Sequence, residues 1–141
     1  MIARIFITIG VLVYALAVPL LEINDTHVFN PEWPPHARLH EVWQLATNSM
    51  IGMLALWLAW GRGNVRLPAV LALLVMGAFL LAYAIRDLYG GSMVLAAGSV
   101  ERTVLGLNLG VVGAAIVVVT ALAAFALDSG RRLRPTRRHG S

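Results

Sequence analysis

The chain alternates between long apolar runs and shorter polar segments. Four of the runs are long enough, as helices, to cross the roughly 30 Å hydrocarbon core of a bilayer. They cover residues 5–21, 42–60, 67–85 and 103–127. Because backbone polar groups find no water inside a bilayer, such segments cross it as helices. The pattern predicts an all-α fold: a four-helix transmembrane bundle in residues 1–128, followed by a basic tail in residues 129–141.

The first apolar run has two interpretations. Arg4 precedes it, and residues 15–17 (ALA) have the small-residue pattern of a signal-peptide cleavage site. Because the apolar residues continue to Leu21, we favour a retained membrane helix. Pro19 is then expected to end or bend this helix near its far interface.

Composition narrows the class of protein further. Hydrophobic residues make up 59% of the chain and charged residues 13%, which is too apolar for an ordinary soluble domain. The absence of cysteine excludes disulfides, thiolate catalysis and cysteine metal sites. All 11 basic residues are arginines, which excludes a lysine Schiff base. No nucleic-acid partner is expected, because no nucleic-acid motif appears and many of the arginines gather in the tail.

The arginines also predict an orientation. Eight fall on the side of the two termini and three on the other side, where six of the 7 acidic residues also lie. Because arginines flank membrane helices mainly on the cytoplasmic side, both termini are expected in the cytoplasm. The expected location is the cell inner (plasma) membrane, with the basic tail held against anionic membrane lipid.

A row of polar residues runs into the second apolar segment. The row consists of His36, His40, Gln44 and Asn48, with Trp33 and Trp43 nearby. Residues spaced four apart lie on the same side of a helix. Because polar groups inside a bilayer face protein or an enclosed cavity, we expect the row to line a sheltered pocket on the extracytoplasmic side.

Such a pocket would suit acid–base chemistry on a hydrophobic small molecule. Imidazole and carboxylate groups can move protons near neutral pH when they are partly removed from water, so the candidate catalytic residues are His36, His40 and Glu41. Glu101 and Asn108 are seven residues apart and would share one face of the fourth helix. The candidate substrate-binding residues are therefore Trp33, Trp43, Gln44, Asn48, Glu101 and Asn108.

The leading prediction is an isomerase or cyclase that acts, without a cofactor, on a lipid-, isoprenoid- or sterol-like substrate. A non-enzymatic accessory or scaffold subunit of a larger membrane complex is the first alternative. A metal-binding protein is the second, since His36 and His40 have the spacing of two ligands on one helix face and His27 is available as a third. A transporter is disfavoured, because no internal repeat or paired helix interruption is present.

A G-x-x-x-G motif at Gly106 and Gly110 permits close approach of another helix. We interpret it as a packing contact within the bundle, and a homo-oligomer contact is the alternative.

In layout, the whole chain resembles the small four-span bacterial membrane proteins of the DoxX-like families. Residues 30–40, NPEWPPHARLH, have the density of a family signature. The chain is also similar to the sterol-isomerase (emopamil-binding) class, which places histidine and glutamate on membrane helices to move a proton on a lipid. This similarity implies such parts for His36, His40 and Glu41.

Overall fold

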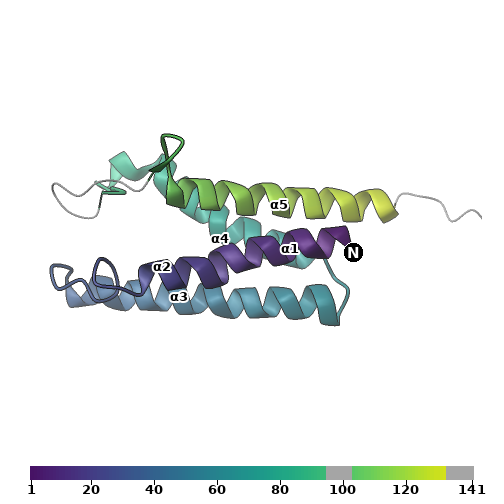
Figure 1. Cartoon of the computed structure of the whole chain (residues 1–141), viewed down its shortest axis with the longest axis horizontal. Helices are drawn as coiled ribbons and strands as arrows, with labels where there is room; N and C mark the ends of the chain where they lie inside the picture. Colours follow the sequence, from purple (N-terminus) through teal and green to yellow (C-terminus); the bar gives the residue numbers. More distant parts are fainter. Residues whose placement is uncertain (95–102, 133–141) are drawn as a thin grey trace, which may run out of the picture.

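A computed structural model describes residues 1–94 and 103–132 of the chain (Figure 1). The first span is continuous from Ile2 to Glu22, and the second runs from Pro35 to Gly61. The elements in order are α1 (Ile2–Leu12), η1 (Val13–Ala17), α2 (Val18–Glu22), α3 (Pro35–Leu56), η2 (Trp57–Gly61), α4 (Arg66–Ala84), η3 (Arg86–Leu88), β1 (Thr103–Val104), β2 (Leu107–Asn108) and α5 (Leu109–Arg132). Within residues 1–94 and 103–132, four helical segments are long and apolar enough to cross a membrane, as predicted. The chain is thus an all-α protein of the multi-pass membrane type.

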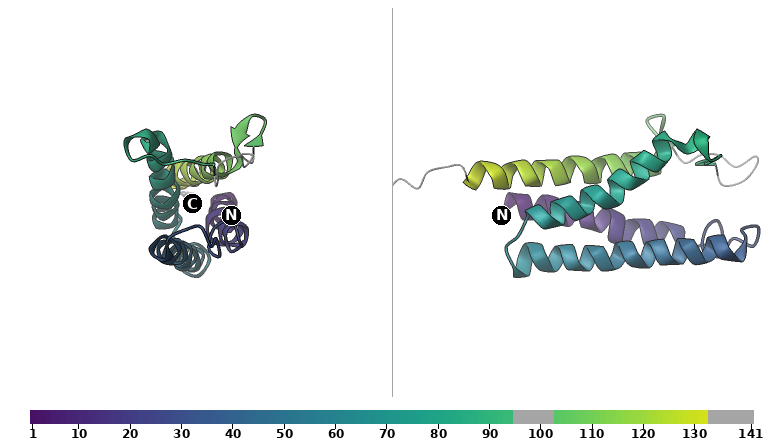
Figure 2. Two further views of the ribbon diagram at one scale, coloured as in Figure 1. Left: turned by 90° about the vertical axis from the view of Figure 1, so that its left-hand side faces the viewer. Right: turned by 180° about the vertical axis from the view of Figure 1, so that it is seen from behind.

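The four spans pack around a core of small side chains. Ile7, Val11 and Tyr14 of the first span belong to this core, but most core residues are alanines: Ala3, Ala55, Ala59, Ala69, Ala72, Ala114, Ala121 and Ala124. Small residues let helix backbones approach closely, which is how helices gain van der Waals contact in lipid. Figure 2 shows α4 crossing obliquely, from beside the second span at the end where the N-terminus lies to beside α5 at the opposite end.

The hydrogen-bond register of the first span changes at η1, whose central residue, Ala15, is four residues before Pro19. A helical Pro19 has no N–H to donate to the carbonyl oxygen of Ala15, so this acceptor loses its usual partner. The turn widens to a π-helix over Val13–Ala17, and the Ser49 hydroxyl of α3 donates to the Ala15 carbonyl oxygen at 3.0 Å. Pro19 therefore does not end the helix, which continues to Glu22.

The end of the bundle near the N-terminus carries arginine–aromatic pairs. The Arg4 guanidinium lies 5.8 Å from the ring centroid of Trp60, and the Trp60 indole N–H donates to the Thr8 hydroxyl at 3.0 Å. At the same end Arg66 Nε donates to Asp128 Oδ2 at 3.1 Å, which ties the start of α4 to the end of α5. Tryptophan and arginine are the residues expected where a span meets the membrane surface.

The fourth helix is shorter at its start than the predicted span of 103–127. It begins at Leu109, and residues 103–108 instead form a two-stranded hairpin in which Thr103 pairs with Asn108. Leu105 and Gly106 occupy the turn with φ values of 54° and 78°, the pair of positive values that a type I′ hairpin turn requires. Gly106 thus lies outside any helix, and the expectation of a G-x-x-x-G helix contact was wrong.

Candidate functional site

The second span projects beyond the first at the end opposite the N-terminus. The bonds from Ser49 to Ala15 and from Trp60 to Thr8 set an antiparallel register, which places Gln44 about level with Glu22. At 1.5 Å per residue, His36 lies about 12 Å beyond that level. The first two turns of α3 therefore stand beside the loop at residues 23–34, outside the length of the first span (Figure 1).

This projection changes the environment of the predicted polar row. His36, His40 and Gln44 are exposed, and Asn48 is only partly buried. A spacing of four residues advances about 400° around a helix, so each step drifts by about 40° and the row winds from the outer face of α3 toward the bundle. The row is neither on one face nor enclosed by the other described helices.

The outer part of the row forms a small aromatic cluster. His40 Nε2 lies 3.0 Å from His36 Nε2, and the two rings are nearly perpendicular, with centroids 4.5 Å apart. The ring of Trp43 is tilted against that of His40 at a centroid distance of 5.6 Å, and Trp43 is 64% exposed. The cluster presents two imidazoles and an indole on the outward surface of α3.

Glu41 and Asn48 lie on the side of α3 that carries its buried residues Leu45 and Gly52. Both are partly buried, and neither forms a hydrogen bond with another described residue. They are the two candidate residues that α3 turns toward the other helices.

The fourth helix does not contribute the face that was predicted. Glu101 lies outside the described residues, and Asn108 belongs to β2 rather than to a helix. The Asn108 side-chain oxygen accepts the backbone N–H of Gly110 at 2.8 Å and that of Val111 at 3.4 Å, so it caps the start of α5. A shared helical face for Glu101 and Asn108 was wrong.

The loop between the first two spans is held together by its own polar side chains. The Asn24 oxygen accepts the N–H of Thr26 at 2.7 Å, and the buried Asn30 oxygen accepts the N–H of Glu32 at 2.9 Å. His27 Nε2 lies 2.6 Å from Glu22 Oε2, and its ring meets that of Trp33 edge-on at 5.6 Å. Trp33 is thus part of the loop.

The metal site predicted at His27, His36 and His40 is not formed. Within residues 1–94 and 103–132 no group of three or more histidine or acidic side chains is positioned to hold one metal ion. His27 is engaged within the loop, whereas His36 and His40 pair with each other on α3.

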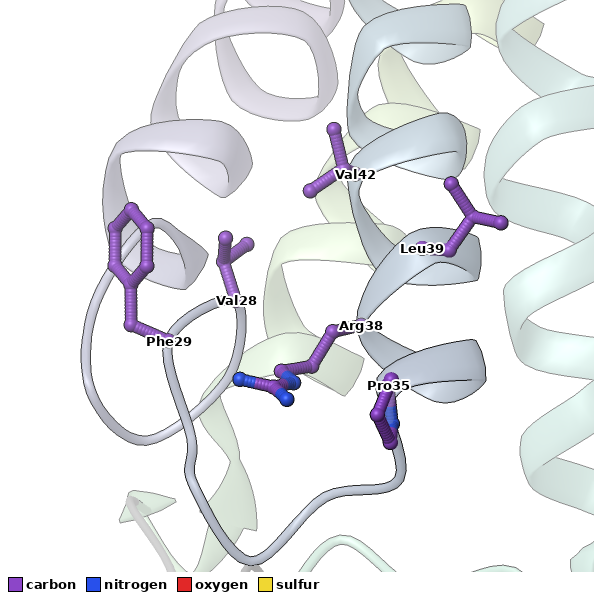
Figure 3. A pocket seen from close by; sticks show the side chains of 6 residues that line it. All are labelled: Val28, Phe29, Pro35, Arg38, Leu39 and Val42. Atoms are coloured by element: carbon purple, nitrogen blue, oxygen red, sulfur yellow. The ribbon is translucent and has the colours of Figure 1, made fainter.

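An open groove lies where the loop meets the projecting turns of α3 (Figure 3). Its volume is about 410 Å³, and its lining is Val28, Phe29, Pro35, Arg38, Leu39 and Val42. Figure 3 shows Arg38 extending from α3 toward the loop that carries Val28 and Phe29. The Arg38 guanidinium forms no hydrogen bond or ion pair with another described residue, so its donors remain available in an otherwise apolar groove.

Sequence reasoning missed this groove. Its four helical residues lie on the face of α3 next to the polar row: Pro35, Arg38, Leu39 and Val42. Val28 and Phe29 join them only through the fold of the loop. The available signal was the helical spacing of Pro35, Arg38, Leu39 and Val42, a face on which Arg38 is the polar residue.

Comparison with known proteins adds no relative: no family model, curated protein or solved structure matches this chain. The similarities to the DoxX-like and sterol-isomerase families therefore stay predictions.

Proposed function

We propose that this chain is a membrane protein that binds the headgroup end of an anionic lipid-like amphiphile in the groove between the first loop and α3. The observation that carries the proposal is Arg38, whose guanidinium has no partner among the described residues and is set in an apolar groove. Anionic phospholipids and isoprenoid phosphates share the required chemistry, an apolar chain that ends in a phosphate.

The lining of the groove suits such a molecule. Phe29 and Leu39 are 59% and 64% exposed, so both offer apolar surface that an acyl or isoprenoid chain would cover. Removal of apolar surface from water is worth about 25 cal/mol per Å². Guanidinium binds phosphate oxygens through paired N–H groups, and such charge-assisted bonds are about twice as strong as neutral ones.

The height of the groove also supports the proposal. Val42 is two residues beyond the level of Glu22, and Arg38 is six residues beyond it, or about 9 Å. The first span is about 31 Å long, close to the thickness of the hydrocarbon core, and the headgroup layer beyond it is roughly 5–7 Å thick. The apolar part of the groove thus begins close to the surface of the hydrocarbon core. The Arg38 backbone lies about 2–4 Å outside the headgroup layer, within reach of its long side chain.

The test measures which lipid stays bound to the purified full chain. We expect native mass spectrometry from nanodiscs to show retention of phosphatidylglycerol or an isoprenoid phosphate over phosphatidylcholine. The substitution Arg38→Gln should reduce retention of the anionic lipid at least fivefold, and separate arms with each lipid distinguish the two sources.

Arg86 provides a matched control at the same end of the bundle. Its guanidinium already donates to the Tyr83 carbonyl oxygen at 2.9 Å and lies 4.3 Å from the Tyr83 ring centroid. Arg86→Gln should therefore leave lipid retention unchanged. Equal losses in the two variants would show a general effect of positive charge and would refute a site at Arg38.

The acid–base reaction stays a prediction, because His36, His40 and Glu41 are not among the residues that line the groove. A double substitution, His36→Ala with His40→Ala, tests it in a deletion strain. Full complementation by this variant would end the isomerase or cyclase interpretation. A stoichiometric protein that co-purifies in mild detergent would instead support the accessory-subunit alternative.

We further infer that both termini are cytoplasmic in the inner membrane. Arg4, Arg62 and Arg66 gather at the end near the N-terminus, whereas Asp25 and Glu32 belong to the loop at the opposite end. Since the chain has no cysteine, single cysteines report the two sides without background. A membrane-impermeant maleimide should label Asp25→Cys but not Arg62→Cys in intact cells, and the reverse pattern would overturn the orientation.

A further inference from the structure

We propose that His36 and His40 form a binding site for one divalent transition-metal ion, Cu²⁺ or Zn²⁺, on the outer surface of α3. The site differs from the predicted three-histidine site because it excludes His27. It is also separate from the groove at Arg38, since neither histidine belongs to the groove lining.

The geometry of the pair is close to that of a chelate. The two Nε2 atoms are 3.0 Å apart. Two imidazole nitrogens bound at 2.0–2.1 Å to one tetrahedral zinc ion are about 3.3 Å apart. A small rotation of either ring therefore replaces the contact between the rings with a shared metal ion.

The helix fixes this arrangement in advance. His36 and His40 both lie within α3, which is helical from Pro35 to Leu56, so their backbones are one turn apart before any metal arrives. Fewer backbone torsions have to be ordered on binding than in a flexible loop, which favours affinity.

The proton inventory also permits binding without ionisation. In a neutral hydrogen-bonded pair one Nε2 carries a proton and the other accepts it. When a metal binds both Nε2 atoms, the ring that carried its proton on Nε2 carries it on Nδ1 instead. Metal binding to such a neutral pair therefore releases no net proton.

The remaining coordination positions stay open. Both histidines are exposed, and no third histidine or acidic side chain in the described part of the chain completes the site. Water or a small anion would fill these positions. Imidazole suits copper and zinc, and the usual order of stability places Cu²⁺ above Zn²⁺.

The test uses the full chain without a histidine tag, in nanodiscs, with CuCl₂ or ZnCl₂ as the added metal. Competition against a chromophoric chelator should give one ion per chain, bound more tightly for Cu²⁺. His36→Ala and His40→Ala should each weaken binding at least tenfold, because either change converts a two-ligand site into a single ligand. An unchanged affinity in either variant would overturn the proposal.

A relocated pair separates the effect of spacing from general damage. His36→Ala combined with Gln44→His creates a new pair at positions 40 and 44 on the exposed surface, and it should restore binding to within a few fold. Binding that remains as weak as in the single variant would overturn the claim that the i, i+4 pair is the site.

Two further variants locate the metal. Copper bound at His40 should quench the fluorescence of Trp43, whose ring lies 5.6 Å away. Trp43→Phe should therefore reduce the quenched fraction without changing the affinity. His139→Ala, in the tail, should leave binding intact, and loss of binding in that variant would refute the site on α3.

Discussion

The closest contact between the first two spans leads to a sharp prediction about Gly52 of α3. A methyl group added at Gly52 would overlap the Cβ atom of Ala15 and lie 3.1 Å from Val11 Cγ1. The helices would have to separate, which also lengthens the hydrogen bond from Ser49 to the Ala15 carbonyl oxygen. We expect Gly52→Ala to destabilise the bundle even though alanine is the better helix former.

The expected magnitude follows from opposing effects. Overpacking a filled contact costs about 1–3 kcal/mol, and a weakened hydrogen bond within the membrane adds about 0.6 kcal/mol. Replacing glycine by alanine inside a helix returns about 1 kcal/mol. The free energy of unfolding should therefore fall by about 0.6–2.6 kcal/mol.

The assay is unfolding in mixed micelles titrated with sodium dodecyl sulfate, followed by tryptophan fluorescence. Gly77→Ala in α4 is the matched control, because no atom lies within 4 Å of the added methyl group. That change should be neutral or stabilise by up to about 1 kcal/mol. If Gly52→Ala and Gly77→Ala have the same stability, the first two spans are not packed as described.

A second substitution tests whether the loss arises at the named contact. Ala15→Gly removes the atom that the new methyl group at Gly52 would overlap. The free energy of unfolding of the double variant should exceed, by at least about 1 kcal/mol, the value obtained by adding the effects of the two single changes. The reason is that the effects of contacting residues are not additive. Additive effects would place the damage elsewhere.

Three further changes test individual polar side chains in the same unfolding assay. Ser49→Ala should cost about 0.6 kcal/mol, because the Ala15 carbonyl oxygen loses its donor, and an unchanged stability would contradict that bond. Tyr14→Phe should be stabilising by about 1 kcal/mol, since the buried Tyr14 hydroxyl has no partner among the described residues, and a loss of stability would instead indicate an unseen partner. Asn108→Ala should cost about 1 kcal/mol by uncapping α5, whereas a smaller change than about 0.3 kcal/mol would argue against the cap.

The spans were predictable because each depends on local composition. A run of apolar residues specifies a membrane helix wherever the rest of the chain lies, and all four runs form helices that meet this criterion. The start of α5 was harder to predict from the sequence, since residues 103–108 are mostly apolar and read as a continuation of the apolar run. Only the hairpin turn within them separates these residues from the helix. That turn places Leu105 at positive φ, which the sequence does not signal for a leucine.

The polar row was harder to interpret because its meaning depends on height as well as on spacing. The expected cost of polar side chains applies inside the hydrocarbon core. The register set by Ser49 and Ala15 instead places His36 and His40 beyond the end of the first span. Their exposure therefore carries no such cost, and spacing alone does not require an enclosed pocket.

The same height explains why the loop and α3 together form the groove. If α3 began only at the level where the first span ends, the loop would have no helix surface to pack against. Phe29 would then have no opposite side of a groove to face. Because the second span begins early, at Pro35, its first turns provide that wall with Leu39 and place Arg38 between the two segments. The prolines before the helix, which fix where α3 starts, thus determine the height at which Arg38 lies beside the loop.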